Sequence, residues 1–305
     1  MPLVFTELSV HFTSLTPLQA VGIPIALTGA IFLSLGAQFQ HRGVNKVDTR
    51  TTGRGGGLSV GQLWSLLRRP SWVIGTLLLG LAVVFQLTSL AFSPLIVVQP
   101  LGAVALVITA ILNARISKTR LDRLSIRAIL LCVGGVGLFV TIAAFTAVET
   151  EITDRQLLTI LIILGVVVVL FGLAFAYLRK RFKAIFYIVA AGALYGFVVT
   201  LAKVVIRRIL QNNFDWLTLS CVAVLLIAAA LGGYFVQTAY SSGPPDLVIA
   251  GLTVIDPLVA VSIGVVVLGE AAAAPLYAIV SFFVTGIIAI YGVLQLAKHH
   301  PQARG

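Results

Sequence analysis

The sequence predicts an all-α polytopic membrane protein with about nine transmembrane helices. Of its 305 residues, 59% are hydrophobic and only 10% are charged. The hydrophobic residues fall in runs of about 20, the length of a helix that crosses a bilayer. The stretches between these runs are too short to bury a core of their own. Composition and spacing therefore exclude a soluble globular protein.

Nine hydrophobic runs are long enough to be spans. The stretch from 71 to 114 has no charged residue and is about twice the length of one crossing, so it predicts a hairpin that turns at Phe92-Ser93-Pro94. The nine expected spans are Leu18–Gln38, Trp72–Phe92, Leu95–Ala114, Ile126–Val148, Leu157–Leu178, Ile185–Val205, Leu217–Tyr240, Leu247–Gly269 and Leu276–Leu296.

The distribution of basic residues predicts the orientation of the chain. Most of the 21 Lys and Arg residues lie in loops 41–70, 115–127 and 179–183 and in the C-terminal tail, which all share one side if nine spans alternate. Because cytoplasmic loops are rich in Lys and Arg, the N-terminus is expected outside and the C-terminus in the cytoplasm. Lys203, Arg207 and Arg208 conflict with this pattern, since they fall near the outer side.

A weak internal repeat predicts a 4+5 inverted arrangement. An offset of 151 aligns Gln86 with Gln237 and Pro94 with Pro245, whereas an offset of 157 aligns residues 100–104 with 257–261. In either register spans 1–4 correspond to spans 6–9, and because equivalent spans are shifted by five, an odd number, the second copy is inverted in the membrane. The chain then divides into a first repeat (1–148, with cytoplasmic loop 41–70), an unpaired fifth span (149–183) and a second repeat (184–305). Inverted repeats are typical of alternating-access carriers, which bind substrate near mid-depth.

Asp256 is the candidate site residue, because it lies near the middle of an expected span. An ionised carboxylate in hydrocarbon costs at least about 3 kcal/mol, so such residues usually face a cavity, a partner or a substrate. Pro257 follows and lacks an N–H group. Asp-Pro therefore predicts an N-cap and the first residue of a half-helix, as found at the sites of transporters. A purely structural cap is the alternative interpretation.

Other polar residues near or within the spans are candidates for a substrate or proton site. Glu270 is expected on the same helix face as Asp256, about 20 Å further out, as an acid at an outer entrance or as a solvated loop end. Lys203 either neutralises Asp256 or, as the favoured interpretation, snorkels to the interface. The side-chain amides within the spans are expected either to line the cavity or to form hydrogen bonds between helices. They include Gln86, Gln99 and Gln237. Gly192 and Gly196 predict close helix packing.

Three stretches of the chain are similar to the drug/metabolite transporter superfamily: Ala91–Leu121, Gly192–Lys203 and Asp256–Glu270, whose Gly-Glu ending resembles the end of an EamA-type repeat. The nine spans and the hairpin sequence AFSPLIVVQPLGA most resemble the NIPA-like magnesium-transporter branch. One feature differs: that branch usually ends its first repeat in Asn-Glu-Arg-Leu, and this chain has Lys118-Thr119-Arg120-Leu121, without the acid. The resemblance implies transport, while the breadth of the superfamily leaves the substrate open.

The favoured function is a carrier that moves a small solute through a central cavity by alternating access, coupled to protonation of Asp256. The alternatives are a magnesium transporter with Asp256 as the metal ligand, a flippase for a lipid or lipid-linked sugar, and a membrane scaffold without transport. Magnesium keeps several waters and needs only one or two carboxylates. The magnesium alternative is weakened because the spans hold only one acid and the basic cluster at 203–208 would repel cations.

The sequence has no constellation of an enzyme. Paired carboxylates and Ser/His or Cys/His arrangements are missing, and no cofactor is expected. Cys132 and Cys221 fall within spans, which argues against a disulfide or zinc site. The basic clusters lack interleaved aromatic residues, so nucleic acid is not an expected partner. The expected partners are membrane lipids and a small-molecule, lipid or ion substrate in a plasma or inner membrane, and a homodimer is compatible with this interpretation.

Overall fold

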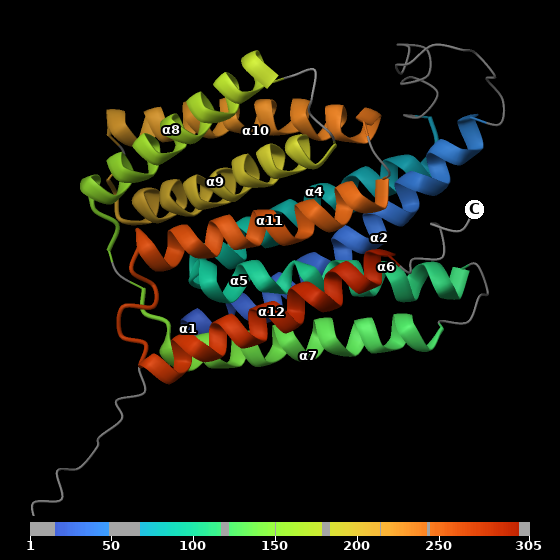
Figure 1. Cartoon of the computed structure of the whole chain (residues 1–305), viewed down its shortest axis with the longest axis horizontal. Coiled ribbons are helices and arrows are strands. Elements are labelled where there is room, and N and C mark those ends of the chain that lie inside the picture. Colours follow the sequence, from blue (N-terminus) through green and yellow to red (C-terminus); the bar gives the residue numbers. More distant parts are fainter. Residues whose placement is uncertain are drawn as a thin grey trace, which may run out of the picture.

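The computed structural model describes residues 16–48, 68–116, 122–149, 151–178, 184–213, 215–242 and 245–298, and the regular structure in these ranges is all α-helical (Figure 1). Nine helical segments of the described chain are long and apolar enough to cross a membrane. The predicted all-α class and the nine spans are therefore confirmed. The orientation of the chain, the inverted repeat and the division at 148 and 183 remain predictions.

The helices follow the expected spans closely. α1 (Pro17–Ala20) leads into the long α2, and the third span consists of two pieces, α5 and α6. The other bounds are α2 (Gly22–Asp48), α4 (Pro70–Phe92), α5 (Leu95–Leu101), α6 (Ala103–Ile116), α7 (Arg123–Thr146), α8 (Asp154–Leu178), α9 (Ala184–Leu210), α10 (Trp216–Ser242), α11 (Pro245–Val266) and α12 (Leu276–Lys298). α2 continues to Asp48, so residues 41–48 are helical rather than part of the expected loop, and residues 49–67 lie outside the described ranges.

The predicted hairpin turn is confirmed at Phe92-Ser93-Pro94. α4 ends at Phe92, Ser93 is extended (φ −122°, ψ 153°) and Pro94 is the N-cap of α5. Proline suits this position because it has no N–H to leave without a partner. α5 and α6 are separated only by Gly102, whose φ and ψ stay helical (−57°, −31°), so one helix face continues across the junction.

The expected break at Asp256-Pro257 is wrong. α11 runs without interruption from Pro245 to Val266 and contains Pro257 in its interior. A membrane helix tolerates an internal proline because neighbouring helices and hydroxyl side chains compensate for the lost backbone hydrogen bond. The helix also stops at Val266, after which the chain turns through Gly269 (φ 73°). The expectation that Glu270 lies on the same helix face as Asp256 is therefore wrong, because the helix ends before Glu270.

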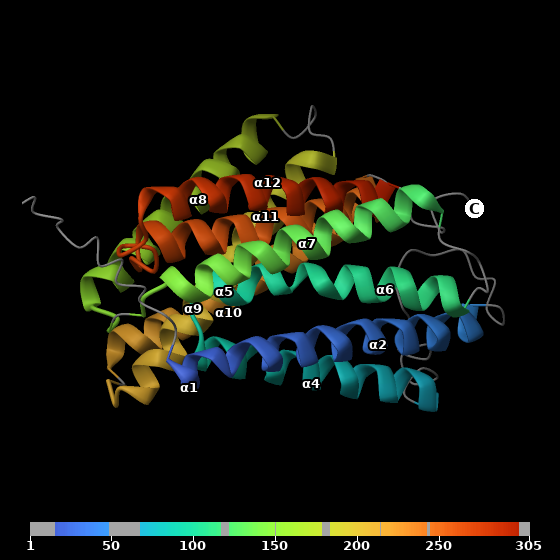
Figure 2. The same ribbon diagram turned by 90° about the horizontal axis from the view of Figure 1, so that it is seen from below.

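The bundle has α5 at its centre. Leu95, Ile96, Val97 and Val98 are all buried, and they join the main hydrophobic core. Around this centre, α2 pairs closely with α4, α7 with α12, and α9 with both α10 and α11 (Figures 1 and 2). α8 lies at the periphery, against α9 and α10.

Small residues allow these helix pairs to approach closely. A Cβ atom on Gly135 of α7 would lie 2.6 Å from the backbone nitrogen of Ala289 on α12, and one on Gly75 of α4 would lie 2.8 Å from the carbonyl of Gly36 on α2. Because lipid is as apolar as a leucine side chain, such backbone contacts supply packing energy that hydrophobicity alone does not.

The bundle has two chemically different ends. We call one the Glu270 end; it holds the connections 147–153, 211–215 and 267–275 and lies at the left of Figure 1. The opposite end, called the Asn113 end, holds the last turns of α2, α6 and α12, at the right of the figure.

Candidate functional site

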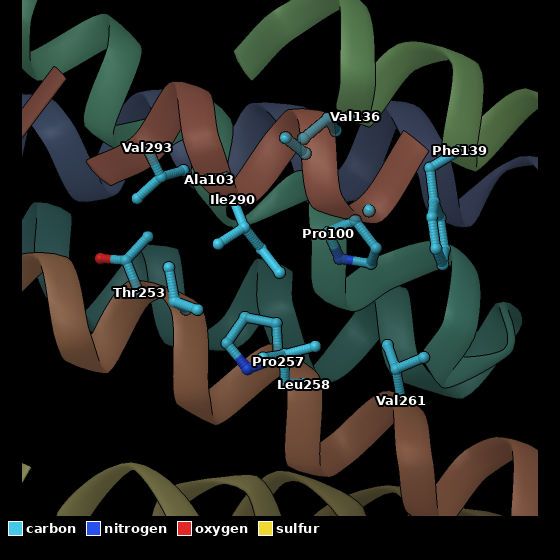
Figure 3. Close-up of a pocket in the computed structure, with 13 residues that line it drawn as sticks. Pro100, Ala103, Val136, Phe139, Thr253, Pro257, Leu258, Val261, Ile290 and Val293 are labelled. Atoms are coloured by element: carbon cyan, nitrogen blue, oxygen red, sulfur yellow. The ribbon is translucent and has the colours of Figure 1, made fainter. Parts of the chain in front are cut away.

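A small cavity lies in the middle of the bundle, where α5 and α6 face α11. It has a volume of about 90 Å³, and α7 and α12 complete its wall. Pro100 of α5 and Pro257 of α11 both project into it, and among the described residues Thr253 is its one polar lining residue (Figure 3). Each proline deprives the carbonyl four residues earlier of its helical donor. On α11 this carbonyl belongs to Thr253, next to the cavity.

The residues before the two prolines are Gln99 and Asp256. Among the described residues, Gln99 Nε2 and Asp256 Oδ1 are buried atoms without a hydrogen-bond partner. Buried polar atoms are nearly always paired, and one that is not calls for an explanation such as an ion or a water. α5 and α11 pack against each other, so both helices that carry these atoms border the centre of the bundle.

Gly192 and Gly196 bring α9 against α11 at the level of Asp256. A Cβ atom on Gly192 would lie 2.7 Å from Ile255 Cβ, and one on Gly196 would lie 2.9 Å from the carbonyl oxygen of Asp256. The close packing that the GxxxG pattern predicted is confirmed. It holds the Asp256 turn in a narrow space between α9 and the central helices.

A larger pocket of about 290 Å³ opens toward the Asn113 end, between α2, α6, α11 and α12. Thr109, Asn113 and Thr253 give it a partly polar wall, and Thr253 also lines the central cavity. On α11 the lining residues Ile249 and Thr253 share a helical face with Asp256, three residues further along. Asp256 itself does not line this pocket, which reaches α11 about one helical turn before Asp256.

The Glu270 end is closed by four charged side chains, Lys203, Arg207, Glu149 and Glu270, which we call the ion cluster. Lys203 Nζ lies 2.9 Å from Glu149 Oε1 and 3.2 Å from Glu270 Oε1. It also donates a hydrogen bond of 2.9 Å to the Ser93 carbonyl. The exposed fraction of the side chain is 2% for Lys203 and 3% for each glutamate, so these charges interact out of contact with water.

Glu270 also closes the N-terminus of α5. Its two carboxylate oxygens accept hydrogen bonds of 2.8 Å from the backbone N–H groups of Leu95 and Ile96. These groups belong to the first turn of α5, where the backbone N–H groups have no acceptor within the helix. The helix dipole also favours an anion at this position. A carboxylate that meets two backbone donors and a lysine has its hydrogen-bonding capacity largely filled.

Glu149 joins the α7–α8 connection to the same cluster. Its Oε2 lies 3.0 Å from Arg207 and accepts a 3.3 Å hydrogen bond from Gln19. Arg208, one residue further along α9, forms a separate set of ion pairs with Asp154 and Asp215.

The expected snorkelling of Lys203 is wrong, because its side chain is buried and paired. Lys203 forms its ion pairs with Glu149 and Glu270, so the expected neutralisation of Asp256 is not found either. The repulsion expected from residues 203–208 is offset, since each of the three basic residues has an acidic partner. Glu270 is buried, which excludes the solvated loop end. The sequence analysis missed Glu149; its placement at the end of an expected span, on the side of Lys203, was the available signal.

The remaining glutamines differ in position. Gln86 is partly buried on α4, near Gly29 of α2. Gln237 is exposed on α10 and lines neither of the two cavities described above. At the Asn113 end, Gln38 of α2 donates a hydrogen bond to the side chain of Asn113. In the described part of the chain, no group of three or more His, Cys, Asp or Glu residues is placed to hold a metal ion.

Nine apolar spans in the described chain, with buried polar atoms on α5 and α11, define a multi-pass membrane protein. The comparison with known families agrees. The chain belongs to the magnesium transporter NIPA family, whose family model matches residues 18–298, and thereby to the drug/metabolite transporter superfamily.

Individual relatives support this membership. An uncharacterized protein of Corynebacterium glutamicum is 29% identical over 252 residues, which is 82% of this chain and 85% of that protein. Probable magnesium transporters NIPA4 and NIPA5 of Arabidopsis thaliana are 32% and 29% identical over 114 and 133 residues. These two matches cover 37% and 44% of this chain and 32% of each plant protein, so the chain spans about a third of their length. No solved structure matches the chain significantly.

These comparisons change the order of the functional hypotheses. The predicted resemblance to NIPA transporters is confirmed, and with it the assignment to a family of membrane transporters. The plant relatives are named probable magnesium transporters, which favours the magnesium alternative over the proton-coupled solute carrier that was the favoured function from sequence.

Proposed function

We propose that this protein transports Mg²⁺ across the cell membrane by a path that passes the Asp256 turn. The observation that carries the proposal is the buried Oδ1 of Asp256, which has no hydrogen-bond partner among the described residues. A carboxylate at this depth is expensive to bury. A cation that binds there during transport supplies the missing counter-charge.

Gln99 is the proposed second ligand. Rotation of its terminal amide exchanges the positions of oxygen and nitrogen, so the buried atom that lacks a partner can be the oxygen. The Thr253 carbonyl, which Pro257 leaves without its helical donor, is a third oxygen close to the path. Mg²⁺ prefers oxygen ligands, keeps several waters and uses only one or two carboxylates.

The 290 Å³ pocket is the proposed route between the Asp256 turn and the Asn113 end. One water occupies about 30 Å³ of liquid, so the pocket has room for an ion together with six waters. Thr109 and Asn113 offer polar groups to those waters. With the orientation expected from the basic loops, this end faces the cytoplasm.

The repeat with an offset of 157 supports the pairing of the two ligands. It places Gln99-Pro100 on Asp256-Pro257, and the two prolines border one cavity. In an inverted arrangement the equivalent residues of the two repeats meet at mid-depth, where transporters of this kind bind substrate. We therefore favour this register over the offset of 151.

The test is Mg²⁺ flux into proteoliposomes that contain the unaltered protein or Asp256→Asn. The substitution keeps the shape of the side chain and removes its charge, and we expect flux to fall by more than about tenfold. The matched control is Asp154→Asn, which removes an acid from the exposed start of α8 and leaves the Asp256 turn untouched. Thermal unfolding in detergent checks that both variants are folded.

Equal flux through the unaltered protein and Asp256→Asn would contradict the proposal. Absence of Mg²⁺ flux from a folded, unaltered protein would also contradict it.

A proton-coupled carrier of a small organic solute is the second candidate. The observation that favours it is the apolar wall of the central cavity, to which the described part of the chain contributes one polar side chain, Thr253. This function predicts uptake that depends on a proton gradient, whereas the magnesium function predicts flux driven by the Mg²⁺ gradient alone. The same proteoliposomes at two lumenal pH values separate the two candidates.

A further inference from the structure

We propose that the ion cluster is a gate at the Glu270 end of the transport path, and that Lys203 is the residue that holds it closed. The proposal rests on the proposed transport function, because a gate requires a path. It assigns to Lys203, Glu149 and Glu270 a role that is separate from substrate binding at the Asp256 turn.

Lys203 connects several segments of the chain at the Glu270 end. Lys203 extends from α9 and meets the α7–α8 connection through Glu149, the α11–α12 connection through Glu270 and the α4–α5 turn through Ser93. A backbone hydrogen bond of 2.8 Å from Val148 to Glu270 ties two of these connections together. The side chain of Lys203 thus joins four parts of the chain directly above the central helix α5. Its removal releases several contacts at once.

The charged side chains of the ion cluster are a poor choice for stability alone. Desolvation makes a buried ion pair a poor source of stability, and apolar residues of similar size often stabilise a protein as well or better. Removing one partner is different, because it leaves a buried charge uncompensated. Lys203 is the one residue of the cluster that pairs with both glutamates, whereas Arg207 pairs with Glu149. The arrangement therefore has two distinct states: closed when Lys203 bridges Glu149 and Glu270, and open when Lys203 leaves and that bridge is lost.

The polar groups at the Asn113 end differ from those at the Glu270 end. There, the described residues place one neutral amide pair, Gln38 and Asn113, between α2 and α6, and the 290 Å³ pocket lies beside it. The offset of 157 aligns Asn113 with Glu270. Equivalent positions of the two repeats thus carry a neutral pair beside a pocket at one end and a charged, dry closure at the other. The structure corresponds to a state that is closed at the Glu270 end.

The experiment measures the side from which the path can be reached. Thr253→Cys is introduced into a Cys132→Ala, Cys221→Ala background, and a membrane-impermeant maleimide is applied to right-side-out and to inverted vesicles. With Lys203 present, we expect labelling from the Asn113 side. Lys203→Gln removes the charge that bridges Glu149 and Glu270, while Glu149 keeps Arg207 and Glu270 keeps the two N–H groups of α5. It is expected to raise the rate of labelling from the Glu270 side on the order of 100-fold.

The matched control is Arg208→Gln. Arg208 lies on the same helix, at the same end and is similarly buried, but its acidic partners are Asp154 and Asp215, outside the ion cluster. It should keep the sidedness of the parent protein. If Lys203→Gln does not fold, Glu149→Gln replaces it, because the same ion pair is lost with almost no change in volume.

Labelling that stays confined to the Asn113 side in folded Lys203→Gln, or in Glu149→Gln where that variant replaces it, would overturn the proposal. The same holds if Arg208→Gln changes the sidedness as strongly. Because labelling needs no transported ion, a failure of the gate is distinguished from a failure of the magnesium function, which the flux measurement tests separately.

Discussion

Asp256 lies within α11 and Glu270 lies just after its end, and the two carboxylates differ in their hydrogen-bond and ion-pair partners. Glu270 meets two backbone N–H groups and Lys203 within 3.2 Å. Asp256 has a buried oxygen without a partner among the described residues. The comparison teaches that burial alone does not identify a binding residue. A buried acid whose partners are all internal holds the protein together, whereas one without partners is the better candidate for a ligand.

The first prediction removes the charge of Glu270. Glu270→Gln leaves only one carboxamide oxygen for the two N–H donors of α5 and directs an amide nitrogen at the other, while Lys203 loses one acid. We expect the free energy of unfolding to fall by about 3 kcal/mol. The measurement is the midpoint of denaturant unfolding in detergent.

The control for this prediction is Asp154→Asn, whose exposed carboxylate should contribute less than about 1 kcal/mol. Equal losses in the two variants would show that the ion cluster is no more tightly coupled to the fold than an ordinary surface pair.

The second prediction concerns the packing that surrounds Asp256. Gly196→Ala places a Cβ atom 2.9 Å from the Asp256 carbonyl and 2.7 Å from Val259 Cβ, so α9 must move away from α11. Overpacking of this kind costs about 1–3 kcal/mol. The measurement is again the unfolding midpoint, combined with Mg²⁺ flux, which we expect to fall because the Asp256 turn shifts.

Gly172→Ala on α8 is the matched control, since no atom outside its own helix lies within 4 Å of the added Cβ. It should be neutral or stabilise the protein by up to about 1 kcal/mol through helix propensity. A Gly196→Ala protein as stable as this control would contradict the close contact between α9 and α11.

The third prediction has the smallest expected effect and concerns Asp215, outside the spans. The Thr218 N–H and hydroxyl donate to this carboxylate and, together with Arg208, hold its pKa below the usual value. A lowered pKa in the folded state stabilises the protein above the unfolded pKa of about 3.9. This contribution is lost as the pH falls through the lower, folded pKa. Asp215→Asn should therefore show a weaker loss of melting temperature between about pH 5 and pH 2.

An identical acid dependence in Asp215→Asn and the parent protein would contradict this assignment. Asparagine is an efficient N-cap, so the start of α10 should persist in the variant and the comparison isolates the charge.

Much of the fold was predictable from local sequence. The nine spans follow from the length of apolar runs, the turn at Phe92-Ser93-Pro94 from the chemistry of proline, and close helix packing from the spacing of Gly192 and Gly196, although the partner helix did not. The site was less predictable. The site role of Asp256, inferred from its cost in hydrocarbon, stays a prediction. The helix around it is continuous, because the surrounding bundle overrides the propensity of Pro257 to break a helix.

The sequence by itself determined the class of the protein. A membrane helix is specified by one continuous run of about 20 apolar residues, so it can be recognised without knowing which other helices it packs against. The resemblance to a transporter family likewise needed only short motifs. What only the tertiary structure decided is the pairing of charges. Lys203, Glu149 and Glu270 are far apart in sequence and meet because three different connections converge above α5. Electrostatic partners depend on distance in space, and a one-dimensional pattern does not contain that distance.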